Sequence, residues 1–140
     1  MNGYDVAVTK IGLDEVKNNA AIREFLKAHA ISGDIDINPA RISWCAAFVN
    51  ACEREAGKKG TGALNAQSFK SYGEEVSEDD ISHGDIVVFH FPQDKPWQGH
   101  VTYFDSWDGD DIVCLGGNQK NMVRKSVYSY DYVTNVRRAT

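Results

Sequence analysis

The sequence has few of the features that mark membrane, secreted or nucleic-acid-binding proteins. Its 15 Lys and Arg are outnumbered by 20 Asp and Glu, which gives a net charge of −5, whereas nucleic-acid binding normally requires clustered basic residues. No apolar run approaches the length that spans a bilayer, and residues 1–5 are not a basic region followed by an apolar stretch. We therefore expect synthesis in the cytoplasm without a signal peptide, no membrane insertion and no nucleic-acid partner.

Cysteine is scarce as well. The three cysteines are Cys45, Cys52 and Cys114, and none belongs to a C-x-x-C pair. An odd number without metal-ligand spacing favours neither a disulfide framework nor a zinc site, so at least one thiol is free. Cys52 and Cys114 fall on an apolar helix face and in the middle of a strand, and we expect them to be buried and inert. Neither a metal nor another cofactor is predicted.

The composition that remains is that of an ordinary soluble domain. A chain of 140 residues that is 42% hydrophobic and 25% charged predicts a single domain over residues 1–140 with one core. Apolar residues three or four apart predict a helix over 14–30, stopped by Gly33, and a loop over 33–39 follows. A second helix is predicted from Ser43 to Ala56 and a shorter one over 63–72.

From residue 84 the hydrophobic pattern changes from helical to strand-like. Strands are predicted over 85–91, 101–105 and 112–115, and two more near 125–128 and 132–137. Helices followed by strands are typical of an α+β domain. We therefore expect N-terminal helices packed on one face of a C-terminal antiparallel sheet of about five strands.

Cys45 is the strongest candidate for a reactive residue. Ser43 is a plausible N-cap for the second helix, so Cys45 would occupy its second position, beside backbone N–H groups that no helical carbonyl satisfies. These groups and the positive end of the helix dipole favour the thiolate, which is the nucleophilic form of cysteine. A cysteine alone is more often a core residue, so the interpretation depends on its partners.

His100 and Asn118 are the expected partners of Cys45. The strands over 101–105 and 112–115 form a hairpin, which brings His100 and Asn118 together. Their side chains share a face only if the connection has an odd number of residues or a bulge intervenes, because a one-residue slip reverses the face. A two-residue turn at Asp108–Gly109 would pair His100 with Gly117 instead. We therefore expect a connection of three or five residues.

These residue types suit acyl transfer by a thiol. A thiolate attacks the acyl carbon, an imidazole pairs with the thiol and protonates the leaving nitrogen, and a side-chain carbonyl fixes the imidazole tautomer. The backbone N–H of Cys45 is a candidate oxyanion donor, and Ser43 and Tyr4 are candidates for a second donor.

Four residues are assigned to substrate binding. Trp44 and Trp97 are interpreted as aromatic walls of a cleft for sugar or peptide, with core packing as the alternative for each. Gly99 flanks His100, and Gly117 is interpreted as a position where backbone approaches the cleft closely.

Four ordered segments resemble the CHAP superfamily of cysteine, histidine-dependent amidohydrolases and peptidases, in particular a phage-endolysin-like branch related to NlpC-type and papain-like enzymes. The segments are Trp44–Val49, Gly84–Phe89, Gly99–Val101 and Leu115–Gln119, and the stretch Asn19–Leu26 resembles the leading helix of that branch. The resemblance implies a papain-like fold and hydrolysis of amide bonds in peptidoglycan, with Cys45 as nucleophile and His100 as base.

The sequence departs from the family at one position. Many relatives carry a glutamate two residues before the asparagine, where this chain has Gly116. Asn118 therefore remains the best candidate to orient His100. Asp105 is the nearest acidic alternative, but it should lie at the far end of its strand from His100.

The leading hypothesis is a monomeric peptidoglycan hydrolase that acts on the stem peptide, either as an N-acetylmuramoyl-L-alanine amidase or as an endopeptidase of the stem or cross-bridge. A phage endolysin released by a holin, or a toxin delivered by a secretion machine, would bring it to the wall. Two alternatives stay open. One is a papain-like protease or deamidase toxin that acts on a protein, and the other is a catalytically silent domain that binds the wall or a partner protein.

Overall fold

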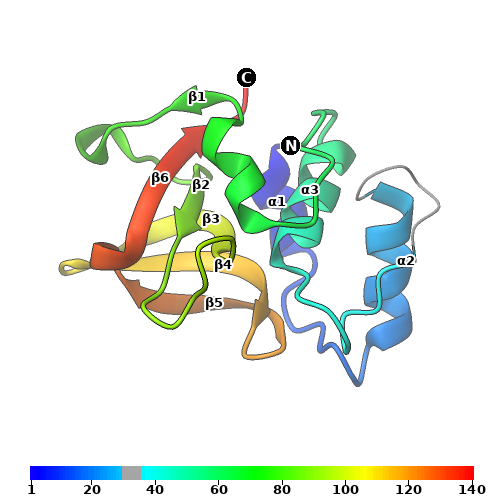
Figure 1. Ribbon diagram of the computed structural model, residues 1–140. Helices are drawn as coiled ribbons and strands as arrows, with labels where there is room; N and C mark the ends of the chain where they lie inside the picture. The colour runs from blue at the N-terminus through cyan, green and yellow to red at the C-terminus, as the bar shows by residue number, and fades with distance from the viewer. Residues whose placement is uncertain (30–35) are drawn as a thin grey trace.

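The computed structural model describes residues 1–29 and 36–140 and has a helical layer beside an antiparallel sheet (Figure 1). The helices are α1 (Gly3–Val8), α2 (Asn19–His29) and α3 (Cys45–Glu55). The six strands found in the described residues are, in sheet order, β1 (Glu74–Glu75), β6 (Val133–Arg138), β2 (Ile86–Phe89), β3 (His100–Asp108), β4 (Asp111–Gln119) and β5 (Met122–Ser129). The predicted α+β class is confirmed, with one more strand than expected because the acidic link contributes β1. None of the helices in the described ranges is long and apolar enough to cross a membrane.

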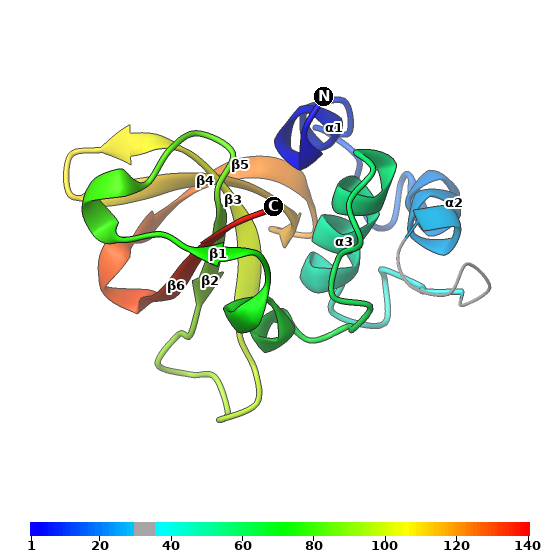
Figure 2. The same cartoon turned by 90° about the horizontal axis from the view of Figure 1, so that it is seen from above.

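Helix α3 lies between the sheet and α2, and α1 borders it on a third side (Figure 2). Every residue from Cys45 to Glu53 is buried, which a helix enclosed on several sides requires. Small residues such as Ala46, Ala47 and Ala51 let its neighbours approach closely. Helix α3 begins at Cys45 and not at the expected Ser43: Trp44 is the N-cap residue and makes no side-chain capping bond. Cys45 is therefore the first residue of the helix.

Helix α2 begins at Asn19, five residues later than the pattern predicted. The backbone at Asp14 bridges Met122, and the Asp14 carboxylate accepts bonds from the N–H groups of Val16 (2.8 Å) and Lys17 (3.0 Å), which forms a turn in place of the first helical residues. The expected stop at Gly33 lies outside the described residues, as does the start of the expected loop.

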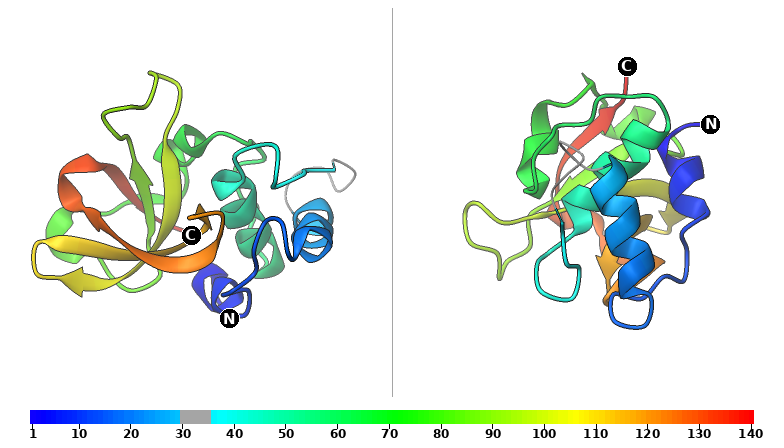
Figure 3. Two further views of the ribbon diagram at one scale, coloured as in Figure 1. Left: turned by 90° about the horizontal axis from the view of Figure 1, so that it is seen from below. Right: turned by 90° about the vertical axis from the view of Figure 1, so that its right-hand side faces the viewer.

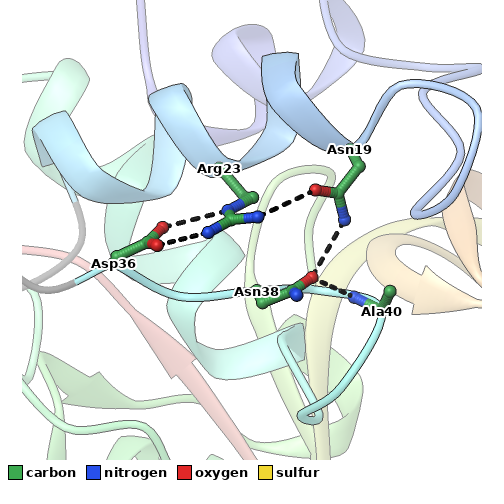
Figure 4. A network of polar contacts seen from close by, with 5 residues as sticks. All are labelled: Asn19, Arg23, Asp36, Asn38 and Ala40. Atoms are coloured by element: carbon green, nitrogen blue, oxygen red, sulfur yellow. Dashed lines mark hydrogen bonds and ion pairs between the residues drawn. The ribbon is translucent and has the colours of Figure 1, made fainter.

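Residues 36–40, which lead into α3, are bound to α2 by a network of hydrogen bonds and an ion pair (Figure 4). Arg23 pairs with Asp36, and Asn19 donates through Nδ2 to Asn38 Oδ1 at 2.9 Å. Asn38 Oδ1 also accepts from the backbone N–H of Ala40 at 3.1 Å. These contacts fix the chain just before the first turn of α3.

The remaining helical segments are short. The helix expected over 63–72 is a 3-10 helix, η1 (Ala66–Ser71), while η2 (Glu78–Asp80) precedes β2 and η3 (Tyr130–Tyr132) precedes β6. Helix α1 was not predicted; it begins with a reciprocal capping box between Asn2 and Asp5.

The β3–β4 hairpin has a two-residue connection, so the expected odd-numbered connection is wrong. Asp108 pairs with Asp111, and only residues 109–110 lie between the strands. A bulge provides the extra residue instead, because Phe104 pairs with Cys114 while Ser106 pairs with Val113. A second irregularity lies in β4, between its pairs with β5 at Gly116 and Gln119.

Both faces of the sheet are covered by apolar side chains. The face toward the helices carries the main core, which includes Cys52, and the opposite face carries a smaller cluster that includes Phe89 and Cys114. All three cysteines are free thiols, and burial raises the pKa of both Cys52 and Cys114. The expectation that these two cysteines are buried is confirmed.

Candidate active site

The structure brings together Cys45 at the head of α3 and His100 at the start of β3. Helix α3 packs directly against β3 and β4. The Cys45 side chain is hydrogen-bonded to the His100 side chain, and the two residues are only 4% and 8% exposed. Cys45 lies in the first turn of its helix, where N–H groups lack helical partners.

Burial and pairing act in opposite directions on the pKa of Cys45. Burial alone would raise the pKa of the thiol, but the charge of His100 and the hydrogen bond to His100 lower it, and so do the backbone of Val101 and the side chain of Ser43. The net effect is a pKa below the ordinary thiol value. Ser43 Oγ lies 4.0 Å from the sulfur.

The pKa of His100 moves in the other direction. Burial would lower it, but the charge of the Cys45 thiolate and the hydrogen bond to Cys45 raise it, and Gln119 and the charge of Asp94 add to this effect. A thiol with a lowered pKa beside an imidazole with a raised pKa favours the thiolate–imidazolium pair. That pair is the reactive state of a cysteine hydrolase.

Gln119 is the residue that contacts the far side of the imidazole. Its Oε1 lies 3.0 Å from His100 Nε2, and its Nε2 donates to the carbonyls of Cys114 (3.2 Å) and Arg124 (2.6 Å). These two donations fix the orientation of the amide, so Oε1 must accept from His100. His100 Nε2 therefore carries a proton, which leaves Nδ1 as the nitrogen available to Cys45.

Asn118 does not contact His100, contrary to the expectation from the sequence. Its backbone has a φ of 57°, a conformation in which asparagine is enriched, and this interrupts the extended strand. The Asn118 side chain instead donates through Nδ2 to Ser43 Oγ at 3.3 Å. The structure thus places Asn118 beside Ser43, and Gln119 beside His100.

Tyr128 is a further neighbour of His100. Its hydroxyl lies 3.3 Å from His100 Nε2, and the two rings are tilted with centroids 5.6 Å apart. Burial raises the pKa of Tyr128 most, and the negative charge of nearby cysteines raises it further. The phenol is therefore neutral. The rings of Phe89 and Phe91 lie near the imidazole as well, with centroids 6.2 and 6.3 Å from that of His100.

A pocket of about 380 Å³ opens beside Cys45. Trp97 and Gly99 line it, as expected for substrate-binding residues, and Trp97 is 65% exposed. Ser43, Leu64, Asn65, Ala66, Asp94 and Gln98 complete the lining around Cys45.

Trp44 and Gly117 do not line this pocket, so their assignment to substrate binding is corrected. Trp44 is fully buried, and its indole N–H donates to Glu15 Oε1 at 3.1 Å. Gly117 lies directly against Trp44: a Cβ at position 117 would come within 2.6 Å of the indole. Both residues therefore support the core beneath the site.

The candidates Tyr4 and Asp105 lie together, away from the pocket. The Tyr4 hydroxyl donates to Asp105, which also pairs with Lys125 at 3.1 Å. Tyr4 is therefore not available as an oxyanion donor, and Ser43 remains. Within residues 1–29 and 36–140, no group of three or more His, Cys, Asp or Glu side chains is arranged to hold a metal ion.

Sequence reasoning missed Gln119, Tyr128 and Asp94. Gln119 follows the expected residue directly, and the one signal that favours it is Asn118 itself, since asparagine often adopts a positive φ and interrupts a strand. Tyr128 lies on β5 and Asp94 in the loop after β2, and no local pattern connects either of them to His100.

The comparison with known families agrees with this geometry. The model of the CHAP domain matches residues 37–118, which is more than half of the chain and includes Cys45 and His100. A search of curated proteins finds no match. The chain therefore belongs to the CHAP domain family of cysteine- and histidine-dependent amidohydrolases and peptidases.

Proposed function

We propose that this protein is a peptidoglycan hydrolase that cleaves an amide bond of the bacterial cell wall with Cys45 as nucleophile and His100 as general base and acid. The observation that carries the proposal is the hydrogen-bonded chain from Cys45 through His100 to Gln119 beside an open pocket. Membership of the CHAP family supports a wall peptide as the substrate.

The proposed reaction begins with the thiolate–imidazolium pair. The Cys45 sulfur attacks the carbonyl carbon, and the carbonyl oxygen becomes an oxyanion. His100 then gives its Nδ1 proton to the leaving nitrogen, which breaks the amide bond and leaves a thioester on Cys45. A water molecule, deprotonated by His100, hydrolyses the thioester and restores the thiol. Gln119 holds Nε2–H throughout, so that Nδ1 faces the sulfur.

The oxyanion needs hydrogen-bond donors near Cys45. The backbone N–H of Cys45 has no carbonyl partner within α3, because it belongs to the first residue of the helix. We assign the second donor to the Ser43 hydroxyl, which lines the pocket. Asn118 Nδ2 occupies an acceptor site of Ser43 Oγ, so the hydroxyl proton of Ser43, which faces the Cys45 sulfur in the resting enzyme, is the one that would turn to the oxyanion.

Both cleavage sites considered from the sequence, the N-acetylmuramoyl-L-alanine bond and a bond within the stem or cross-bridge, fit this chemistry. We propose that the enzyme acts as a monomer at the cell wall, as an endolysin released by a holin or as a toxin delivered by a secretion machine. A protease or deamidase that acts on a protein would use the same residues. A silent binding domain is disfavoured, because it would need neither the lowered pKa of Cys45 nor the ordered His100.

Loss of turbidity of purified cell walls tests the proposal. The wild type should clear the suspension, whereas Cys45→Ala and His100→Ala should not, and Cys52→Ala is the matched control because Cys52 is a buried thiol of the core. Unchanged clearing by either active-site variant would refute the thiol mechanism. Mass spectrometry of the released fragments then identifies the bond, because new amino termini on L-alanine indicate an amidase and other termini indicate an endopeptidase.

A further inference from the structure

The loop between β2 and β3 forms one wall of the pocket beside Cys45. It projects beyond the ends of these strands (Figure 2, Figure 3) and is anchored to η1. Gln67 of η1 donates through Nε2 to the carbonyls of Pro96 (2.6 Å) and Gln98 (2.7 Å). Because one side chain holds two carbonyls of the loop, the wall has a defined position relative to the nucleophile.

Asp94 brings a negative charge into this wall. Apart from Cys45, it is the only ionisable side chain among the described residues that line the pocket. Its Oδ2 accepts the backbone N–H of Phe91 at 2.8 Å, which fixes the carboxylate within the loop. Asp94 lines the same pocket as Cys45, and its charge raises the pKa of His100.

No cation within the described residues neutralises Asp94. None of the ion pairs there includes it, and Oδ2 alone of its two oxygens has a hydrogen-bond partner. The adjacent Lys95 directs its ammonium over the Trp97 ring, 5.5 Å from the ring centroid, and not to the carboxylate. Asp94 therefore has one oxygen and a full charge available to a ligand in the pocket.

The other walls of the pocket are suited to an aliphatic chain. Leu64 and Trp97 present large apolar side chains that are 40% and 65% exposed. A carboxylate between apolar surfaces complements a ligand with methylene groups and a terminal positive charge, because an ammonium is desolvated at low cost only when it is paired.

We propose that Asp94 binds an ammonium group of the substrate, so that the enzyme selects wall peptides with a free amine near the cleaved amide. This inference rests on the proposed function and specifies its substrate class. The amine has two possible sources, the free amino terminus of the peptide or the side chain of a diamino acid. Both have the same chemistry, and the experiment separates them.

The test uses two pairs of stem-peptide fragments. In one pair the amino terminus is free or acetylated, and in the other the side-chain amine of the diamino acid is free or acetylated. The wild type should prefer the free amine in one pair by about tenfold to a hundredfold in kcat/KM, the range for a hydrogen bond to a charged group. Asp94→Asn and Asp94→Ala should reduce this preference to nearly one, mainly through slower cleavage of the free-amine form.

The asparagine variant keeps an oxygen that can accept from Phe91, so it separates loss of charge from loss of loop structure. Asp110→Asn is the matched control, because Asp110 lies in the turn between β3 and β4 and the variant loses the same charge. It should keep the preference of the wild type. Equal slowing of both forms by Asp94→Asn would overturn the proposal, since it would show that Asp94 acts through His100 alone.

A binding measurement makes the test independent of turnover. The Cys45→Ala variant should bind the free-amine fragment more tightly than the acetylated one, with the same preference as in the kinetic assay. The double variant with Asp94→Asn should lose this preference. Binding with this preference but without hydrolysis by the wild type would support the ammonium site and contradict the proposed hydrolase. Equal affinity of Cys45→Ala for the free and acetylated forms of both pairs would overturn the ammonium site.

Discussion

Replacing Gln119 with alanine removes the acceptor that holds His100 Nε2–H. The bond measures 3.0 Å, and its donor carries a positive charge in the reactive state, so it contributes about 1.5–3 kcal/mol. If that stabilisation is lost in the transition state, kcat/KM falls by about 10- to 150-fold. Tyr128 still contacts Nε2 at 3.3 Å, which keeps the loss below that expected for removal of His100 itself.

The same substitution predicts a shift in the pH profile. Burial lowers the pKa of His100, but Cys45 raises it, and the hydrogen bond that His100 donates to Gln119 raises it further. Without Gln119 the pKa of His100 falls, so the alkaline limb of kcat/KM, where the imidazolium loses its proton, moves to lower pH. The assay is hydrolysis of a wall fragment across the pH range, with thermal denaturation to measure stability. The carbonyls of Cys114 and Arg124 also lose a donor, at about 1–3 kcal/mol for each one left unsatisfied.

Asn118→Ala is the matched control, because Asn118 neighbours Gln119 but contacts Ser43. Its alkaline limb should coincide with that of the wild type. The assignment of Gln119 would be refuted if Asn118→Ala moved the alkaline limb while Gln119→Ala left it in place.

Three further predictions concern the buried cysteines, the thiolate–imidazolium pair of Cys45 and His100, and the packing of Gly117 against Trp44. In the folded protein, iodoacetamide should modify Cys45 and spare Cys52 and Cys114, because burial raises the pKa of the latter two; peptide mass spectrometry reads this directly, and equal labelling would contradict it. The pH profile of kcat/KM should be bell-shaped, rising as the lowered pKa of Cys45 is passed and falling as the raised pKa of His100 is passed, and a single limb would contradict the pair. Gly117→Ala should cost about 1–3 kcal/mol in the free energy of unfolding, because its Cβ would lie 2.6 Å from an indole carbon; unchanged denaturant unfolding would show that the core yields.

Much of the fold was accessible from the sequence, because hydrophobic periodicity reports which face of an element is buried. The change from helical to strand-like patterns near residue 84 marks the start of the main run of strands. The ends of the helices and strands were harder to predict. The start of α2 depends on the bonds that Asp14 makes to its own turn and to β5, and these compete with helix formation.

The pairing of Cys45 with His100 could be predicted from local motifs, but the residue that contacts the far side of His100 could not. Its identity depends on two irregularities in β4 and its neighbours. The bulge in β3 after Phe104 shifts the register by one residue, which alone would direct Asn118 toward His100. The positive φ of Asn118 then turns that side chain away and presents Gln119. Neither the bulge nor the positive φ of Asn118 produces a periodic pattern of residues that could be read from the sequence.

The burial of Trp44 could not be predicted from the sequence, because it also depends on contacts between distant parts of the chain. Its neighbours in the sequence favour a cleft wall and a core position equally. Its burial depends on Gly117 from β4 and on Glu15 from the turn before α2, which are distant in the chain. Such contacts exist only after the helical layer has packed on the sheet.

The most direct test of the central claim, that His100 holds Cys45 as a thiolate, is the rate of Cys45 alkylation by iodoacetamide as a function of pH, measured in the wild type and in His100→Ala. In the wild type the rate should rise through a pKa below the ordinary thiol value. In His100→Ala burial is no longer opposed by the imidazolium, so the inflection should move to higher pH. An inflection at or above the ordinary value in the wild type, unchanged by His100→Ala, would contradict the account.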